Sequence, residues 1–93
     1  MRIYKYTLLL TDEQIVVLPQ KARILSVQNQ YERVVLYALV TPGEIPKSRK
    51  VYIFGTGREI SEYVARTCEF AGTAVLEDGA FVWHVFVGPE PRD

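Results

Sequence analysis

One eight-residue stretch limits the fold of this 93-residue chain more than any other part of it. From Arg33 to Val40 the sequence reads Arg-Val-Val-Leu-Tyr-Ala-Leu-Val, which is apolar at nearly every position. Such a run is typical of a central β-strand whose two faces are both covered. Covering both faces requires a second layer of structure or a neighbouring subunit.

The rest of the chain has the residue pattern of a β protein. Short apolar segments recur at intervals of about ten to fourteen residues and are separated by turn-forming residues. We interpret Asp12-Glu13 as a hairpin connection. We interpret Asp78-Gly79 as a type I′ hairpin turn, because that turn needs positive φ at both central positions. The pattern predicts strands over residues 2–9, 15–18, 22–30, 33–40, 49–54, 70–76 and 80–87.

Two local irregularities complete the predicted architecture. In residues 22–30 the apolar parity changes after Ile24, which indicates a β-bulge or a strand buried on both faces. Residues 59–66 are the one helix candidate, of one or two turns, because apolar side chains recur there at helical spacing. The predicted fold class is therefore mostly β: a small barrel or a two-layer sandwich of about seven short strands with at most one short helix.

Length and composition predict a single domain. The chain is 48% hydrophobic and carries eleven aromatic residues, which is enough for one compact core. We expect residues 1–88 to form that domain and residues 89–93 to be a flexible tail. No apolar run approaches the ~18–20 residues that cross a bilayer, and the start lacks the apolar core of a signal peptide. We therefore expect a cytoplasmic protein with no membrane partner.

The cysteine and histidine content argues against disulfide and metal chemistry. Cys68 is the only cysteine, so no internal disulfide forms, and this agrees with a reducing compartment. The Cys- and His-rich spacings of structural zinc sites are absent. We expect neither a metal nor another cofactor.

Charge is divided unevenly along the chain although the net charge is zero. Residues 1–58 hold nine Lys and Arg against four Asp and Glu, whereas residues 59–93 hold two against seven. One interpretation is a basic face for an anionic ligand or a partner; the other is that the two halves interleave and their charges mix. A net charge of zero argues against binding of nucleic acid, because nucleic-acid-binding domains are usually basic overall. We expect self-association, because a small β protein has exposed strand edges that pairing would protect.

The segment Val51–Arg58 ends a predicted strand in a Gly-Thr-Gly turn that is followed by an arginine. Glycines let backbone N–H groups point into a common space, and residues 47–58 hold four cations and no acidic residue. The turn is neither a Rossmann nor a Walker A loop, whose further glycine and Gly-Lys-Ser/Thr are missing. An ordinary glycine-rich strand end with solvated cations is the alternative. The candidate ligand-binding residues are Arg49, Lys50, Tyr52, Gly55, Thr56, Gly57 and Arg58.

His84 is the only histidine of the chain, and histidine is the residue type whose ordinary pKa lies nearest to pH 7. A lone histidine inside a strand is more often a hydrogen-bonded structural residue than a catalytic base. Cys68 and His84 could form a thiolate pair only if the fold joined them, and no orienting partner can be named. We assign no catalytic residue, and a small enzyme is the third interpretation after two non-enzymatic ones.

Eight short strings occur in one order across residues 3–86. They are Ile3-Tyr4-Lys5-Tyr6, Thr11-Asp12-Glu13-Gln14, Leu18-Pro19, Ile24-Leu25-Ser26-Val27-Gln28, Ala38-Leu39-Val40, Gly55-Thr56-Gly57, Gly72-Thr73 and His84-Val85-Phe86. Together they resemble a family of short proteins of unknown function from bacteriophages and their bacterial hosts. The resemblance implies a phage or prophage context and supplies no catalytic residue. Members often have His-Pro after the Gly-Thr-Gly, where this chain has Arg58-Glu59, and an arginine cannot replace a histidine base near neutrality.

Two functions are expected from these observations. The first is a non-enzymatic phage accessory protein that binds and sequesters a small anionic ligand of nucleotide type, for example a bacterial defence signal. The second is a protein-interaction module or inhibitor that docks on a host or phage protein through a strand edge or an aromatic patch. In both cases we expect the protein in the cytoplasm of the bacterial host.

Overall fold

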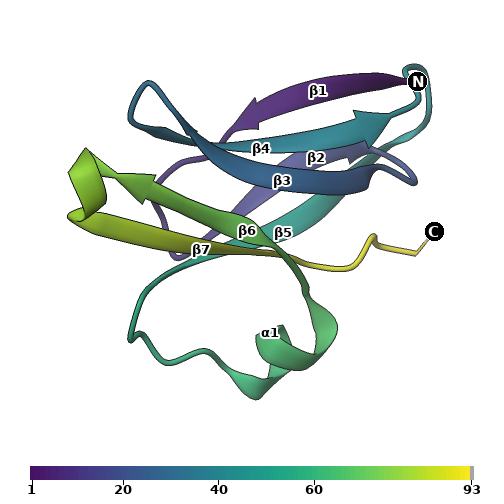
Figure 1. Ribbon diagram of the computed structural model, residues 1–93. Helices are drawn as coiled ribbons and strands as arrows, with labels where there is room; N and C mark the ends of the chain where they lie inside the picture. The colour runs from purple at the N-terminus through teal and green to yellow at the C-terminus, as the bar shows by residue number, and fades with distance from the viewer. Residues whose placement is uncertain (93) are drawn as a thin grey trace.

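The chain folds as a two-layer β-sandwich with one short α-helix (Figure 1). The structure is a computed structural model that describes residues 1–92. Seven strands form one three-stranded and one four-stranded sheet, and the two sheets do not close into a barrel. The prediction of a mostly β fold is confirmed, and of the two architectures left open the sandwich is the one observed.

The three-stranded sheet has the order β1-β4-β3 and is antiparallel. It consists of β1 (Arg2–Thr7), β3 (Arg23–Gln30) and β4 (Arg33–Val40). The apolar run from Arg33 to Val40 is β4, and it is the central strand, as predicted. Its side chains alternate between the core and the outer face, and the core-facing ones are at most 2% exposed: Val34, Leu36, Ala38 and Val40. The bulge predicted in β3 is present, as a register shift between Ile24 and Ser26.

The four-stranded sheet has the order β2-β5-β7-β6 and is also antiparallel. It consists of β2 (Glu13–Pro19), β5 (Pro46–Gly55), β6 (Glu69–Leu76) and β7 (Phe81–Val87). Every second residue of its two central strands points into the core. Val51, Val85 and Val87 are fully buried there, against the apolar face of the other sheet.

The predicted hairpin at Asp12-Glu13 is wrong. β1 and β2 belong to different sheets, and the segment between them crosses from one layer to the other. Leu8, which is 4% exposed, turns into the core at the start of the crossing. The Gln14 side chain then accepts from Leu9 N–H (3.0 Å) and donates to Leu9 C=O (2.6 Å), so it satisfies the backbone that leaves the sheet. Polar turn residues fit a crossing as well as a hairpin, so the pattern did not separate the two.

The two sheets converge where β3 passes β6. Asn29 Nδ2 donates to Val75 C=O (2.8 Å) across this line. A Cβ on Gly72 would lie 3.0 Å from the backbone nitrogen of Val27, and Gly72 has φ +148°, so glycine is required there on two counts. The side-by-side course of β3 and β6 therefore covers one edge of each sheet.

The hairpin predicted at Asp78-Gly79 is present and joins β6 to β7. Asp78 (φ 53°) and Gly79 (φ 97°) both have positive φ, and Ala80 N–H donates to Glu77 C=O (3.0 Å), as a type I′ turn requires. The left-handed stretch begins one residue earlier, at Glu77, in the helical turn η1 (Glu77–Gly79).

The one α-helix, α1 (Glu62–Thr67), lies within three residues of the predicted segment. The Ser61 side chain caps it by accepting from Val64 N–H (3.2 Å). Val64 is buried and holds the helix on the outer side of the four-stranded sheet, away from the other layer (Figure 1).

Candidate ligand-binding site

The seven residues proposed as a ligand site lie along β5 and the turn after it, and the structure does not bring them together. Successive strand residues point to opposite faces, so Arg49 faces inward and Lys50 and Tyr52 face outward. The Gly55–Arg58 turn lies at the far end of the strand. It is separated from Lys50 by five residues, roughly 17 Å at the rise of a strand.

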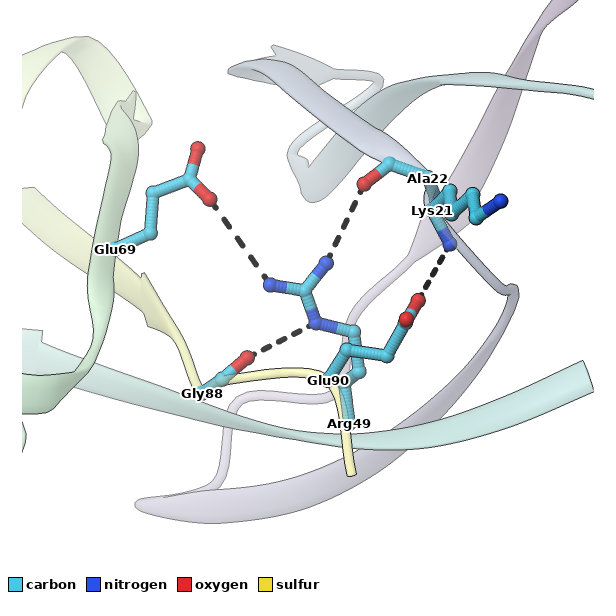
Figure 2. Close-up of polar contacts among 6 residues, drawn as sticks. All are labelled: Lys21, Ala22, Arg49, Glu69, Gly88 and Glu90. Atoms are coloured by element: carbon cyan, nitrogen blue, oxygen red, sulfur yellow. Dashed lines mark hydrogen bonds and ion pairs between the residues drawn. The ribbon is translucent and has the colours of Figure 1, made fainter. Parts of the chain in front are cut away.

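Arg49 is a structural residue at one end of the sandwich (Figure 2). It is 7% exposed and donates through Nε to Gly88 C=O (2.9 Å) and through Nη1 to Ala22 C=O (3.5 Å). Its Nη2 lies 3.9 Å from Glu69 Oε1, which supplies the compensating charge. The guanidinium therefore joins the segments that precede β3, begin β6 and follow β7, and its donors are directed at protein groups.

Within the predicted tail, Glu90 takes part in the same corner of the fold (Figure 2). Its Oε1 accepts a hydrogen bond from Lys21 N–H (2.5 Å). Asp93, the last residue of that predicted tail, lies outside the described residues.

Three of the donors in and beside the Gly-Thr-Gly turn have partners within the protein. Arg58 N–H donates to Gly55 C=O (3.1 Å), which closes the turn on itself. The Arg58 guanidinium lies 3.6 Å from Asp12 Oδ1, and Thr56 Oγ1 lies 2.7 Å from His84 Nε2. Gly57 has φ +90°, so the turn needs a glycine for its own conformation.

Lys50 and Tyr52 line a small cavity between β5, α1 and the segment after β7. The cavity has a volume of about 220 Å³, and Tyr63 and Cys68 form its other wall. Burial raises the pKa of Tyr52, and the nearby Glu13 carboxylate raises it further. Glu13 Oε2 also lies 3.7 Å from Lys50 Nζ, so the one cation of this cavity is already paired.

His84 is held between two hydroxyl groups on the outer face of the four-stranded sheet. Thr56 Oγ1 lies 2.7 Å from Nε2, and Thr73 Oγ1 lies 2.9 Å from Nδ1. The imidazole thereby ties the turn after β5 to β6. Cys68 precedes Glu69, which pairs with Val87, three positions along β7 from His84, so roughly 10 Å of strand separate the start of β6 from His84 and Cys68 lies beyond that.

A different region gathers cations that have no acidic partner. The strands of the three-stranded sheet carry four cations (Arg2, Lys5, Arg23 and Arg33) and no Asp or Glu. Within residues 1–92, none of these four forms an ion pair with a carboxylate. The basic first half of the chain thus places a surplus of positive charge on one layer of the sandwich.

Two of these cations border a cavity of about 410 Å³ on the outer face of this sheet. Lys5 and Thr7 come from β1, and Arg33 comes from the start of β4. Gln30 lies directly opposite Arg33, and its Oε1 accepts from Lys5 Nζ (2.9 Å). Val35, which is 1% exposed, and Tyr31 complete the lining. We call this the basic cavity: Lys5, Thr7, Gln30, Tyr31, Arg33 and Val35.

Tyr31 stands at the rim of the basic cavity in an unusual backbone conformation. It is 91% exposed and forms, with Glu32, the two-residue turn between β3 and β4. Both residues are left-handed, with φ of 53° and 62°, where Asn and Gly are the usual residues. A bulky aromatic side chain is therefore presented to solvent at a conformational cost.

The basic cavity was missed in the sequence because its residues come from three separate strands. Lys5 and Arg33 are 28 positions apart, and they line one cavity because β1 and β3 both pair with β4. The signal that was available is the absence of acidic residues from residues 23–30 and 33–40. That signal says which segments are basic without saying that they share a face.

The described residues hold neither a cluster of metal-ligating side chains nor a helix that could span a membrane. In the part of the chain that the structure describes, no three His, Cys, Asp or Glu side chains gather as metal ligands would. No helix among residues 1–92 has the length and apolar character needed to span a membrane.

Comparison with known proteins gives a family and no further match. No curated protein and no solved structure matches the chain. One family model, described as Domain of unknown function (DUF7352), matches residues 1–93. The match covers the whole chain, and the protein therefore belongs to this family.

Proposed function

We propose that the protein is a non-enzymatic binder that captures a small anionic ligand of nucleotide type in the basic cavity. The observation that carries the proposal is that two cations, Lys5 and Arg33, line one cavity whose lining contains no acidic residue. The cations that were expected to bind the ligand, Arg49, Lys50 and Arg58, each lie within 4 Å of a carboxylate oxygen of the protein. An anion gains more from the unpaired cations, because it does not have to displace a carboxylate.

The polar wall of the basic cavity fits a phosphate group. Lys5 and Arg33 provide charge-assisted donors, and the Thr7 hydroxyl provides a neutral one. Gln30 fixes the Lys5 ammonium group through its amide oxygen, which leaves the amide NH₂ to donate to a ligand. The Lys5 side chain is therefore partly ordered before a ligand arrives.

The rim and the size of the cavity favour a ligand that carries a ring. Tyr31 offers an exposed aromatic face, on which a nucleobase stacks at a gain of about 1–3 kcal/mol. The volume of about 410 Å³ lies within the ~300–1,000 Å³ range of small-molecule sites. A mononucleotide satisfies both conditions, with its phosphate between Lys5 and Arg33 and its base on Tyr31.

The surroundings of the two most reactive side chains, His84 and Cys68, favour binding without catalysis. Both ring nitrogens of His84 are engaged by threonine hydroxyls, and Cys68 lies too far away to be activated by it. The resemblance to phage and prophage proteins suggests a purpose for capture alone. A phage protein that sequesters a nucleotide signal would block a bacterial defence system without hydrolysing the signal.

Thermal unfolding with a panel of linear and cyclic nucleotides tests the proposal. A ligand at about one hundred times its dissociation constant stabilises the fold by about 2.7 kcal/mol, which raises the melting temperature by roughly 10 °C or more in a domain of this size. The double variant Lys5→Gln/Arg33→Gln should lose the shift. The matched variant Lys50→Gln/Arg58→Gln should keep it. If no nucleotide at millimolar concentration shifts the wild type, or if the second variant alone loses the shift, the proposal fails.

A further inference from the structure

The four strand edges of the two sheets differ in how they are protected. β3 and β6 cover each other's edges, as the Asn29–Val75 hydrogen bond and the close approach of Gly72 to Val27 show. β1 and β2 are the outer edges of their sheets. An uncovered edge offers unpaired N–H and C=O groups to another chain.

The direction of these groups follows from the hydrogen bonds at the ends of the strands. Ile53 N–H donates to Asp12 C=O (3.2 Å), and Gln20 N–H donates to Ile45 C=O (2.7 Å), so both flanks of β2 are bonded to the β5 side. Bonding alternates along an antiparallel ladder. Even-numbered residues of β2 therefore bond to β5, and Glu13, Ile15 and Val17 direct both backbone groups to the open edge.

The edge of β1 is protected by charge. Leu8 N–H donates to Val34 C=O (2.9 Å), so the odd-numbered residues Ile3, Lys5 and Thr7 face that edge. Lys5 is the middle one of the three, and a lysine on an edge strand opposes pairing with another strand. Two copies of β1 side by side would also bring their Arg2 and Lys5 charges together.

The edge of β2 is less protected, and its one proline, Pro19, lies at the end of the strand. Residues 14–19 contain no charged side chain, and the register with β5 is uninterrupted, so no bulge turns the edge away. Ile15 and Val17 are 63% and 54% exposed, on the outer face beside that edge. Glu13 is the one charged residue of the strand, and it lies at its end.

We propose that β2 pairs with β2 of a second copy, in an antiparallel register centred on Val16. Only odd-numbered residues direct their N–H and C=O groups to this edge. Each must therefore lie opposite an odd-numbered residue of the other copy. A register centred on Val16 places Ile15 opposite Val17 in both directions, with two full hydrogen-bond exchanges and two apolar cross-strand pairs. It also keeps the two Glu13 carboxylates at opposite ends. The result is a continuous eight-stranded sheet across a two-fold axis.

The expected dimer is weak. Pairing two seven-residue strands buries less than the ~1,600 Å² of a standard interface, so we expect a dissociation constant on the order of micromolar. The basic cavity lies on the other sheet, so this proposal is independent of the proposed ligand.

Sedimentation velocity from micromolar to about millimolar concentration tests the proposal. Wild type should shift from monomer to dimer over this range. Val17→Pro removes an N–H that faces the edge, together with the Val17 side chain, and no hydrogen bond to β5, so it should fold normally by circular dichroism and stay monomeric. Ile3→Lys, on the β1 edge, should dimerise like the wild type. A monomeric wild type at every concentration, or a Val17→Pro variant that still dimerises, would overturn the proposal.

Paired charges test the register. In the register centred on Val16, Ile15→Glu/Val17→Lys places each introduced carboxylate opposite an introduced ammonium group and should retain the dimer. Ile15→Lys/Val17→Lys opposes like charges and should weaken it at least tenfold. If the Glu/Lys variant is monomeric while the wild type dimerises, the proposed register is wrong.

Discussion

The cations of the two sheets have different partners, although both sheets belong to one small domain. In and beside β5, Arg49, Lys50 and Arg58 each approach a carboxylate, and Arg49 is buried as well. The three-stranded sheet carries four cations without an ion pair to any carboxylate described in residues 1–92. A cation that the fold has already compensated contributes to stability, whereas an uncompensated one remains available to a ligand. Density of positive charge along the sequence therefore does not show which cations lack a carboxylate partner in the fold.

The largest expected effect follows from removing the buried cation. Arg49→Met leaves the Gly88 and Ala22 carbonyls and Glu69 without their partner, and we expect a loss of about 3 kcal/mol in the free energy of unfolding. The melting temperature should fall by roughly 15 °C. Arg33→Met, the same change at an exposed position, should cost less than about 0.5 kcal/mol. Equal losses for the two variants would contradict the division between the sheets.

Tyr31 should show opposite effects on stability and binding. Tyr31→Asn places a residue suited to the left-handed conformation in the turn, so we expect a gain of about 0.5–1 kcal/mol in urea unfolding. The same variant loses the stacking surface, and its affinity for a nucleotide should fall about tenfold. Binding of inorganic phosphate should be unchanged. A variant that gains stability and keeps full nucleotide affinity would remove Tyr31 from the site.

A smaller effect is expected from the exposed ion pairs of the four-stranded sheet. Lys50 and Arg58 lie 3.7 and 3.6 Å from Glu13 and Asp12, and all four side chains are more than half exposed. Because solvent screens such pairs, Lys50→Gln and Arg58→Gln should each change the free energy of unfolding by less than about 0.5 kcal/mol. A loss above about 1 kcal/mol in either variant would place that residue with Arg49 as a structural cation.

The smallest expected effect is on the melting temperature at alkaline pH, and it involves one tyrosine from each sheet. Burial raises the pKa of Tyr6 and of Tyr52 above 10.0. The unfolded chain then loses these protons first as pH rises, so their contribution is complete below about pH 10 and is lost above it. Tyr6→Phe and Tyr52→Phe should each flatten the fall in melting temperature between about pH 9 and 11. Tyr31→Phe, at a fully exposed position, serves as the control and should follow the wild type.

Local patterns predicted most of the fold, and they failed where distant segments meet. The apolar run of β4, the bulge after Ile24 and the Asp78-Gly79 turn depend on neighbouring residues, and all three are confirmed. The supposed hairpin at Asp12-Glu13 failed because strand pairing depends on tertiary packing. In the same way, Lys5 and Arg33 line one cavity only because distant strands, β1 and β4, are neighbours in the sheet. Single-sequence patterns contain turn and strand signals, and they do not contain the partner of each strand.

Nuclear magnetic resonance titration of the amide groups tests the central claim most directly. The claim is that an anionic ligand of nucleotide type binds at the basic cavity. Titration with a nucleoside monophosphate should shift the amide signals of Lys5, Thr7, Gln30, Tyr31 and Arg33 in a saturable way, and addition of salt should reverse the shifts. Saturable shifts confined to Lys50 and Gly55–Arg58 would contradict the claim and return the site to the β5 turn.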